Sequence, residues 1–351
     1  MSDSRKNTKR VQLKETLLER IVSGEFSYGN RFPGLHQLCQ QYKASYVTVS
    51  RAMKLLEKEG YLQAQNGVGY FVSYIHPDIV SSRKIVNFIT ALSPNTRQWH
   101  LMEDGKKFFE EAGWEVNCYS TLEPSFSFQL LNSPDAYNVL FSARVNWSNF
   151  TANLSHVAQR VVVIGQLSGN PDITSIISDE YETVRRAIEY FRNRKRFKTA
   201  IVCASPEREL DMLRTAAWRS IMQSCGYSLD VLDHLCCTID GNSSVNDETH
   251  FRQTYAKWLR INKKYIDSII ISFSPLCFLN ACQDTAVQVP DDIAVLAIAR
   301  SSKPDNTSIP FLDHNLSGHF KCALEILEER FKTGRKAPGA WHFVPPGELF
   351  H

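Results

Sequence analysis

The chain has 351 residues, 43% of them hydrophobic, and a formal net charge of +3, and its length suits two or three domains. No stretch approaches the roughly 20 apolar residues of a membrane-spanning helix, and no apolar signal core follows the polar residues 1–10, so we expect a cytoplasmic protein with no membrane partner. Residues 1–74 contain 11 Lys and Arg against 6 Asp and Glu, a net charge of +5, whereas the remaining residues carry −2. Such a basic segment is typical of modules that bind nucleic-acid phosphates.

Residues 11–59 predict three successive helices. Apolar residues at helical spacing indicate a first helix over 11–23, which Gly24 ends. Pro33 is suited to begin a second, short helix. Ser45 stands at an N-cap position, so we expect the third helix to run from Tyr46 to Glu59. Four of its residues fall mainly outside its apolar stripe, namely Tyr46, Ser50, Arg51 and Lys54.

A β-hairpin with a glycine-rich tip follows, because two short apolar runs flank Gly67 and Gly69. Three helices and a hairpin are the plan of a winged helix-turn-helix. The third helix of that fold fits the major groove of DNA, which is about 12 Å wide. The sequence therefore predicts a DNA-binding domain over residues 1–74 and a linker over residues 75–83.

From residue 84 onward, compact apolar runs alternate with helical patterns. We expect strands over 85–89, 114–119, 137–141, 160–164, 199–203, 266–271 and 293–298, and helices over 106–112, 183–191, 213–224 and 319–331. Continuous apolar strands that alternate with helices indicate parallel sheets covered on both faces. The predicted fold class is a multi-domain chain, with an α+β winged helix before a two-lobed α/β domain over residues 84–351.

Residues 11–72 resemble the winged-helix domain of the GntR regulator family. The ungapped matches are Val11-x-Leu13, Ile21-x-x-Gly24, Phe32-Pro33, Leu38, Ser45-x-x-Thr48-Val49-x-x-Ala52-x-x-x-Leu56-x-x-x-Gly60 and Gly67-x-Gly69-x-Phe71-Val72. The resemblance implies that the start of the third helix and the wing tip contact DNA, at Ser45, Tyr46, Thr48, Ser50, Asn66 and Gly67.

The chain departs from the GntR pattern at four of its polar positions, one of which is Gly34, where the family favours Ser. The family favours Arg where His36, Tyr46 and Ser50 stand here, so the resemblance does not imply an operator sequence. Positive charge is expected instead from Arg51, Lys43, Lys54 and the basic arm from Arg5 to Arg10, and His36 is kept as a candidate contact.

Residues 84–345 look like the effector-binding domain of LacI-type regulators, which is similar to periplasmic sugar-binding proteins. The matches are Ile176-Ile177-Ser178-Asp179, Phe197-x-Thr199-Ala200-Ile201, Arg214-x-x-Ala217-Trp218, Val289-Pro290-Asp291-Asp292-Ile293-Ala294-Val295 and Ile309-Pro310. A GntR reader joined to a LacI-like sensor is similar to the arabinose-repressor type of chimera. It implies a repressor whose partners are double-stranded operator DNA, a sugar-like effector and a second copy of the chain.

The LacI-type resemblance places the ligand between the lobes at strand ends, as is general for open α/β sheets. The candidate ligand-binding residues are Asn95, Trp99, Arg144, Asp179, Arg214, Ser274 and Arg300. Arg214 leads because a guanidinium forks two hydrogen bonds, and a surface salt bridge is its alternative. Trp99 fits sugar stacking or core packing, and Asp179 fits the cleft or a helix N-cap. Acidic positions common in the family are absent, which favours an anionic or hydroxyl-rich ligand.

Two other functions remain open. One is a DNA-binding regulator whose α/β domain serves only as a dimerisation scaffold, in line with the absent acidic positions. The other is an enzyme with an accessory DNA-binding domain. However, no G-x-S-x-G, P-loop or H-E-x-x-H motif occurs, and the nine irregularly spaced cysteines include no C-x-x-C pair. We therefore expect reduced interior cysteines, no catalytic residue, no metal and no cofactor.

Overall fold

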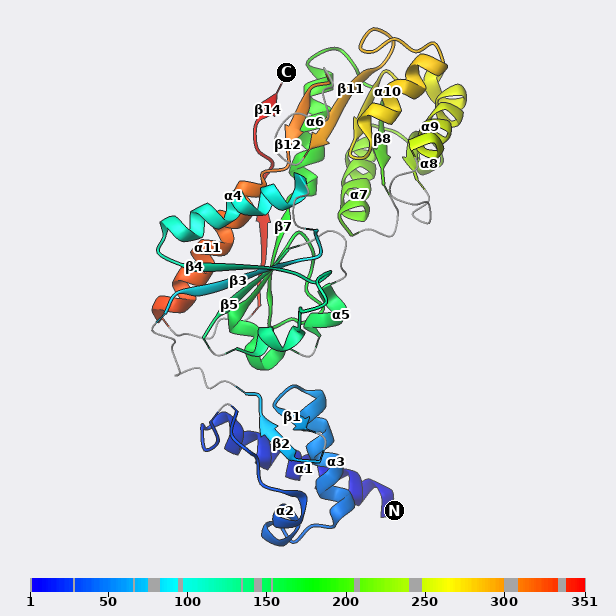
Figure 1. Cartoon of the computed structure of the whole chain (residues 1–351). Coiled ribbons are helices and arrows are strands. Elements are labelled where there is room, and N and C mark those ends of the chain that lie inside the picture. Colours follow the sequence, from blue (N-terminus) through cyan, green and yellow to red (C-terminus); the bar gives the residue numbers. More distant parts are fainter. Residues whose placement is uncertain are drawn as a thin grey trace. The chain divides into compact units, whose positions relative to one another are not determined.

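The computed structural model (Figure 1) describes residues 2–27, 29–65, 67–74, 83–93, 97–133, 135–141, 147–152, 154–204, 209–239, 248–299, 309–333 and 339–350. The chain forms two compact units. Unit 1 contains residues 1–176 and 320–342, and unit 2 contains residues 177–319 and 343–351. The chain therefore passes between the units three times. Within the described ranges, no helix is long and apolar enough to cross a membrane.

The N-terminal domain, in unit 1, is the expected winged helix-turn-helix. It contains α1 (Ser2–Val22), α2 (Leu35–Gln41), α3 (Tyr46–Lys58) and the antiparallel strands β1 (Leu62–Gln65) and β2 (Gly69–Val72). Apolar side chains of all three helices form its core, where Leu17, Leu38 and Val49 are fully buried. The first helix begins at Ser2 rather than at Val11, and the third ends at Lys58.

Unit 1 also contains a six-stranded sheet in the order β13-β7-β6-β5-β3-β4. Its strands are β3 (Ile85–Thr90), β4 (Glu115–Ser120), β5 (Tyr137–Phe141), β6 (Val161–Ile164), β7 (Thr174–Ser178) and β13 (Trp341–Val344). The pairs that link β4, β3, β5, β6 and β7 are all parallel. The accompanying helices are α4 (Arg97–Glu111), η1 (Phe128–Asn132), α5 (Trp147–Thr151), η2 (Ser155–Arg160) and α11 (Leu316–Thr333).

Unit 2 contains a second six-stranded sheet, in the order β14-β12-β11-β10-β8-β9. Its strands are β8 (Thr199–Cys203), β9 (Cys236–Thr238), β10 (Ser268–Ile271), β11 (Ala294–Ala299), β12 (Phe311–Asp313) and β14 (Leu349–Phe350). Only β14 pairs antiparallel. The helices are α6 (Glu180–Arg192), α7 (Glu209–Ser224), α8 (Leu229–Leu235), α9 (Glu248–Asn262), η3 (Lys263–Tyr265) and α10 (Pro275–Asp284).

The expected parallel sheets are thus confirmed, with short apolar strands such as β5 and β8 buried along their whole length. Strands this apolar need cover on both faces. Because neighbouring strands run parallel, their carboxyl ends share one edge of each sheet. In unit 2 this edge is formed where β8, β10 and β12 end, at Cys203, Ile271 and Asp313. Among the candidates of unit 2, Arg214 lies on the helix after β8 and Ser274 follows β10, whereas Asp179 follows β7.

Candidate functional site

The start of α3 is organised by a helix cap. Ser45 has an extended backbone, and its Oγ accepts a hydrogen bond from the Thr48 amide at 3.3 Å. The Ser45 and Thr48 hydroxyls also lie 2.9 Å apart in a hydrogen bond. The cap pairs the Thr48 amide, which has no partner within the helix. It also fixes the start of α3, which the sequence analysis predicted to contact DNA.

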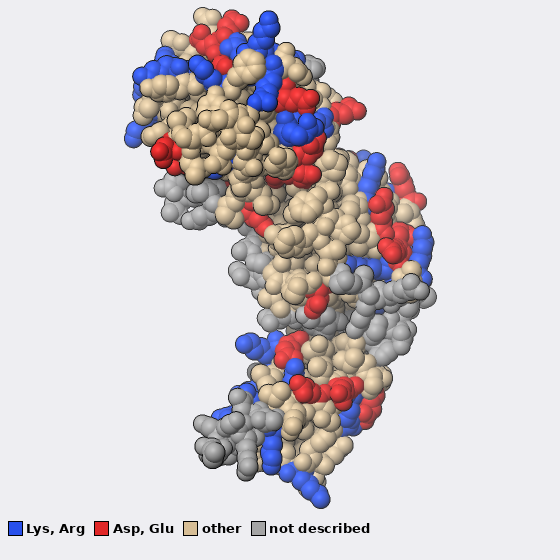
Figure 2. All heavy atoms as spheres, turned by 180° about the vertical axis from the view of Figure 1, so that it is seen from behind, with Lys and Arg blue, Asp and Glu red and all other residues tan. Residues whose placement is uncertain are grey.

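The predicted DNA-contacting residues are accessible. Tyr46, Arg51 and Lys54 are exposed on α3, and Thr48 and Ser50 are half-buried. His36 is exposed on α2, with its ring 5.6 Å from that of Tyr46. In the view of Figure 2, basic side chains lie among neutral ones on the lowest part of the N-terminal domain. A basic surface beside an exposed helix end can approach phosphates and base edges together.

The wing tip has a backbone that favours glycine. Gly67 and Gly69 have φ angles of +75° and +132°, where a side chain is strained. Arg31, which the sequence analysis missed, donates from Nη2 to the Val68 carbonyl at 2.6 Å. The position of Arg31 opposite the wing depends on its bridge to Phe71, which no local pattern reveals. The predicted contact Asn66 lies outside the described residues.

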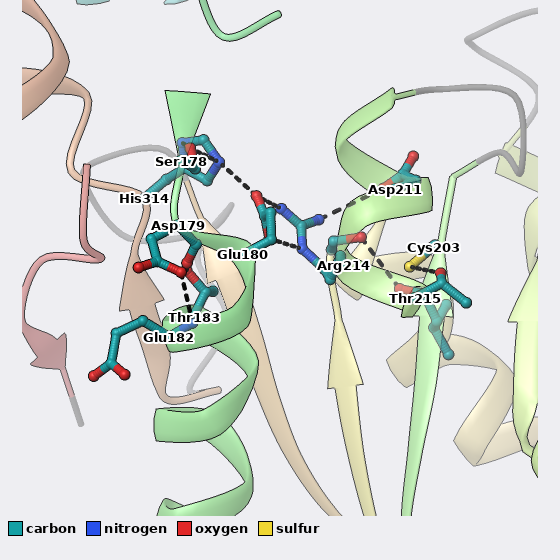
Figure 3. Close-up of polar contacts among 12 residues, drawn as sticks. Ser178, Asp179, Glu180, Glu182, Thr183, Cys203, Asp211, Arg214, Thr215 and His314 are labelled. Atoms are coloured by element: carbon teal, nitrogen blue, oxygen red, sulfur yellow. Dashed lines mark hydrogen bonds and ion pairs between the residues drawn. The ribbon is translucent and has the colours of Figure 1, made fainter. Parts of the chain in front are cut away.

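In unit 2, Arg214 of α7 is paired with Glu180 of α6 (Figure 3). Its Nε and Nη2 donate to Glu180 Oε2 and Oε1 at 2.7 and 2.8 Å, and Nη1 donates to Asp211 Oδ1 at 3.5 Å. Arg214 is 4% exposed and Glu180 is 3% exposed. Of the two open interpretations, the salt bridge is therefore present, but it is buried rather than at the surface. The sequence analysis did not single out Glu180.

The pair continues into a buried polar chain that sequence patterns did not reveal. His314 Nε2 lies 3.5 Å from Glu180 Oε1 and 3.0 Å from Ser178 Oγ. Ser178 Oγ is also 3.1 Å from His319 Nε2, and His319 Nδ1 is 2.8 Å from the Asn315 carbonyl. A carbonyl only accepts, so His319 Nδ1 carries the proton, and in the neutral form of His319 its Nε2 accepts from Ser178. Ser178 is then free to accept from His314.

The charges in this cluster hold Glu180 ionised. Burial by itself raises the pKa of a carboxyl, but Arg214 and His314 outweigh it and lower the pKa of Glu180 to about 2. The same carboxylate raises the pKa of the Arg214 guanidinium above its usual value, against the effect of burial. Glu180, Asp211 and Arg214 together bring two carboxylates to one guanidinium. The cluster therefore has no surplus positive charge for an anionic ligand.

Two further candidates lie in unit 2. Asp179 is the N-cap of α6, and its side chain accepts from the Glu182 amide at 2.9 Å, so the capping alternative holds. Ser274 precedes α10 with a φ of +44°, and its side chain makes no capping hydrogen bond.

A pocket borders the polar cluster around Glu180 and Ser178. Its volume of about 300 Å³ lies within the size range of small-molecule sites. It is lined by Ser178, Asp179, Glu180, Tyr181, Leu213, Ala216, Ala217, Ser220 and Phe343.

In unit 1, one of the three predicted ligand-binding residues lies within the described ranges. Trp99 is half-buried on α4, and Asn95 and Arg144, like Arg300 of unit 2, lie outside the described residues. Two buried polar groups here, Thr90 Oγ1 and Trp147 Nε1, have no hydrogen-bond partner among the residues that the structure describes. Such groups are uncommon in folded proteins, and sequence reasoning did not identify either one.

The cysteines are all free in the structure, four of them buried and five half-buried, so the expected interior packing holds only in part. Burial raises the pKa of Cys203, Cys237 and Cys282 to about 12, which keeps these thiols protonated and poorly nucleophilic. Over the described ranges, no group of three or more His, Cys, Asp or Glu side chains could hold a metal ion.

Comparison with known proteins gives a sequence match for the N-terminal part of the chain and a likeness of fold for the α/β part. Residues 9–72 match the family model of bacterial regulatory proteins of the gntR family. The chain is 30% identical over 113 residues to the arabinose metabolism transcriptional repressor of Geobacillus stearothermophilus. The aligned stretch covers 32% of this chain and 31% of the repressor. The chain thus matches about a third of the length of this curated relative.

The α/β part is similar in fold to solved regulators. A transcriptional regulator, CelR, in complex with cellobiose aligns with a TM-score of 0.61 at 12% identity, over 88% of this chain and 91% of that one. A LacI family transcriptional regulator from Arthrobacter sp. FB24, in complex with lactose, aligns with a TM-score of 0.58 at 16% identity, over 77% and 98%. At these identities the likeness establishes the fold.

Proposed function

The chain joins a gntR-family winged helix to an α/β domain with the fold of LacI-type regulators, and from this premise we propose that it is a transcriptional repressor controlled by a small ligand. The winged helix binds a specific operator, and an uncharged, hydroxyl-rich sugar bound by the α/β domain changes the affinity for that operator. The observation that carries the proposal is the accessible, capped start of α3 on a domain of net charge +5, in the same chain as a sugar-regulator fold.

The ligand class follows from the charges around Arg214. An anionic sugar acid or phosphate would need a guanidinium with free donors, but Arg214 is engaged by Glu180 and Asp211. A neutral sugar offers hydroxyl groups that donate to carboxylates and accept from amides, which suits this balance. The solved regulators in complex with lactose and cellobiose, and the arabinose metabolism repressor, support the same class.

The candidate contacts divide into two roles. Arg214 positions Glu180, whereas Asp179 follows β7 and Ser274 follows β10, at the carboxyl ends of strands, where polar groups meet ligands in open α/β folds. Trp99, Asn95, Arg144 and Arg300 remain proposed ligand contacts.

The regulator works as a homodimer in the cytoplasm on a near-palindromic operator, because two-fold symmetry places two winged helices on successive turns of DNA. Ligand shifts the equilibrium between two arrangements of the dimer and weakens operator binding through a coupling free energy of about 1–3 kcal/mol.

Thermal melting of the purified protein against neutral sugars, sugar acids and sugar phosphates tests the ligand class. A ligand that binds only the folded protein raises the melting temperature by mass action. We expect a neutral sugar to raise it and to weaken binding to an operator selected from random DNA. Stabilisation by sugar acids alone would contradict the neutral class, and failure to select any DNA sequence would contradict the regulator itself.

The pairing of Arg214 with Glu180 and Asp211 also favours a second candidate, in which the α/β domain is a dimerisation scaffold without an effector. Under this alternative, no member of the panel changes the melting temperature of protein that still selects an operator. The two candidates therefore give opposite results in one experiment.

A further inference from the structure

Two large apolar side chains are exposed where α3 begins. Tyr46 is 51% exposed and Val47 is 57% exposed, although the buried stripe of α3 is complete without them. Valine is β-branched and a weak helix former, so the helix itself gains nothing from it at this position. The Tyr46 ring lies 5.6 Å from the His36 ring, while Val47 reaches into solvent from the first turn.

The hydroxyl groups nearest to these side chains are engaged in the cap. Ser45 Oγ and Thr48 Oγ1 bond to each other, and Ser45 Oγ also accepts from the Thr48 amide. Positive charge lies further along the helix, because Arg51 and Lys54 are exposed four and seven residues after Val47. Residues at these spacings share one helix face. This face is therefore apolar at its start and cationic beyond it.

In the major groove, base edges present donors, acceptors and one apolar group, the C5-methyl of thymine. Arginine reads guanine with a two-point fork, and neither Tyr46 nor Val47 can form one. We propose that Val47, with Tyr46 beside it, contacts thymine methyl groups, so that each operator half-site carries thymine opposite the first turn of α3. This inference rests on the proposed function and adds the base that the helix start reads.

The charge on the same face identifies the occupant as DNA. A helix face that is apolar at its start and cationic one and two turns later matches a base edge flanked by backbone phosphates. This helix face lies on a domain with a net charge of +5, and α3 falls within residues 9–72, which match the gntR family model.

The test removes single methyl groups from the DNA. Full-length protein selects a binding site from random duplexes, and each thymine of that site is then replaced by deoxyuridine, which lacks only the C5-methyl. Affinity is measured by fluorescence anisotropy for the wild type, for Val47→Ala and for the control Val68→Ala. Val68 is also apolar, lies in the wing and is 47% exposed, so its variant loses the same atoms elsewhere on the domain.

For the wild type, we expect deoxyuridine at one or two positions of each half-site to weaken binding about threefold to fivefold, the effect of one buried methyl group. Val47→Ala should bind the thymine and deoxyuridine duplexes equally, and Val68→Ala should retain the difference. Circular dichroism confirms that the variants fold. If no thymine is sensitive, or if Val47→Ala keeps the difference, the inference is wrong although the regulator stands. If no sequence is selected, the proposed function fails first.

Discussion

Arg214 and Glu180 form a buried ion pair with two parallel hydrogen bonds, of 2.7 and 2.8 Å, that joins α7 to α6 within unit 2. Glu180 follows Ser178 and Asp179, just after the point where the chain first enters unit 2. The pair therefore fixes the start of α6 at this entry. Two-point geometry of this kind depends on the planar guanidinium, which lysine does not reproduce.

Arg214→Ala should destabilise the protein by about 3–5 kcal/mol, because it leaves Glu180 and Asp211 buried without their counter-ion. Urea unfolding measures this loss. The double variant Arg214→Met with Glu180→Leu removes both charges of the pair and should recover part of the stability. If Arg214→Ala instead leaves stability unchanged and abolishes only the response to sugar, Arg214 contacts the ligand directly.

The stability of the protein should depend on pH through Glu180. Its pKa is lowered from 4.5 to about 2 in the folded protein, so the ionised form stabilises the fold fully above pH 4.5. This contribution, about 3 kcal/mol for a shift of this size, is lost as the pH falls toward 2. Urea unfolding between pH 6 and pH 3 should show the loss, and Glu180→Gln should flatten that part of the profile. If the free energy of unfolding of Glu180→Gln falls as steeply over the same pH range, the loss comes from other carboxyl groups.

Gly105→Ala should destabilise unit 1 although alanine is the better helix former. A Cβ at this position would come within 2.5 Å of the Phe320 ring, which is stacked on Phe88 in the core. Overpacking of this kind costs about 1–3 kcal/mol, more than the roughly 1 kcal/mol that alanine contributes to a helix. Thermal melting measures the difference. Phe320→Leu should relieve the clash, so strictly additive effects in the double variant would contradict the packing explanation.

Gly105 also explains one limit of the sequence analysis. The expected helix over 106–112 starts at Arg97 in the structure and includes Gly105. Helix propensity alone predicts a break at this glycine, whereas packing against Phe320 leaves no space for a side chain there. The helix α9 was not anticipated, although its buried Phe251, Tyr255 and Leu259 recur every four residues. The short strands β9, β12 and β14 depend on pairing with distant strands, which local patterns do not reveal.

The two candidate sites differed in how much of them the sequence revealed. The cap at Ser45 and the exposed face of α3 arise within one helix, so spacing alone predicted them. The partner of Arg214 was not predictable in the same way, because Glu180 lies 34 residues away in the chain. His314, which contacts Glu180, lies between β12 and α11. Such pairings follow from the packing of α6, α7 and β12 rather than from any motif.

Arg31→Ala should weaken operator binding by about threefold to tenfold while the winged helix stays folded. Arg31 donates to the Val68 carbonyl at 2.6 Å, so its loss frees the wing tip, and ordering a free segment on DNA lowers affinity. Fluorescence anisotropy across a salt series measures the change. Arg83→Ala, which removes an exposed arginine outside the winged helix, controls for net charge. A reduction of the salt slope by about one, with no other loss, would instead identify Arg31 as a phosphate contact.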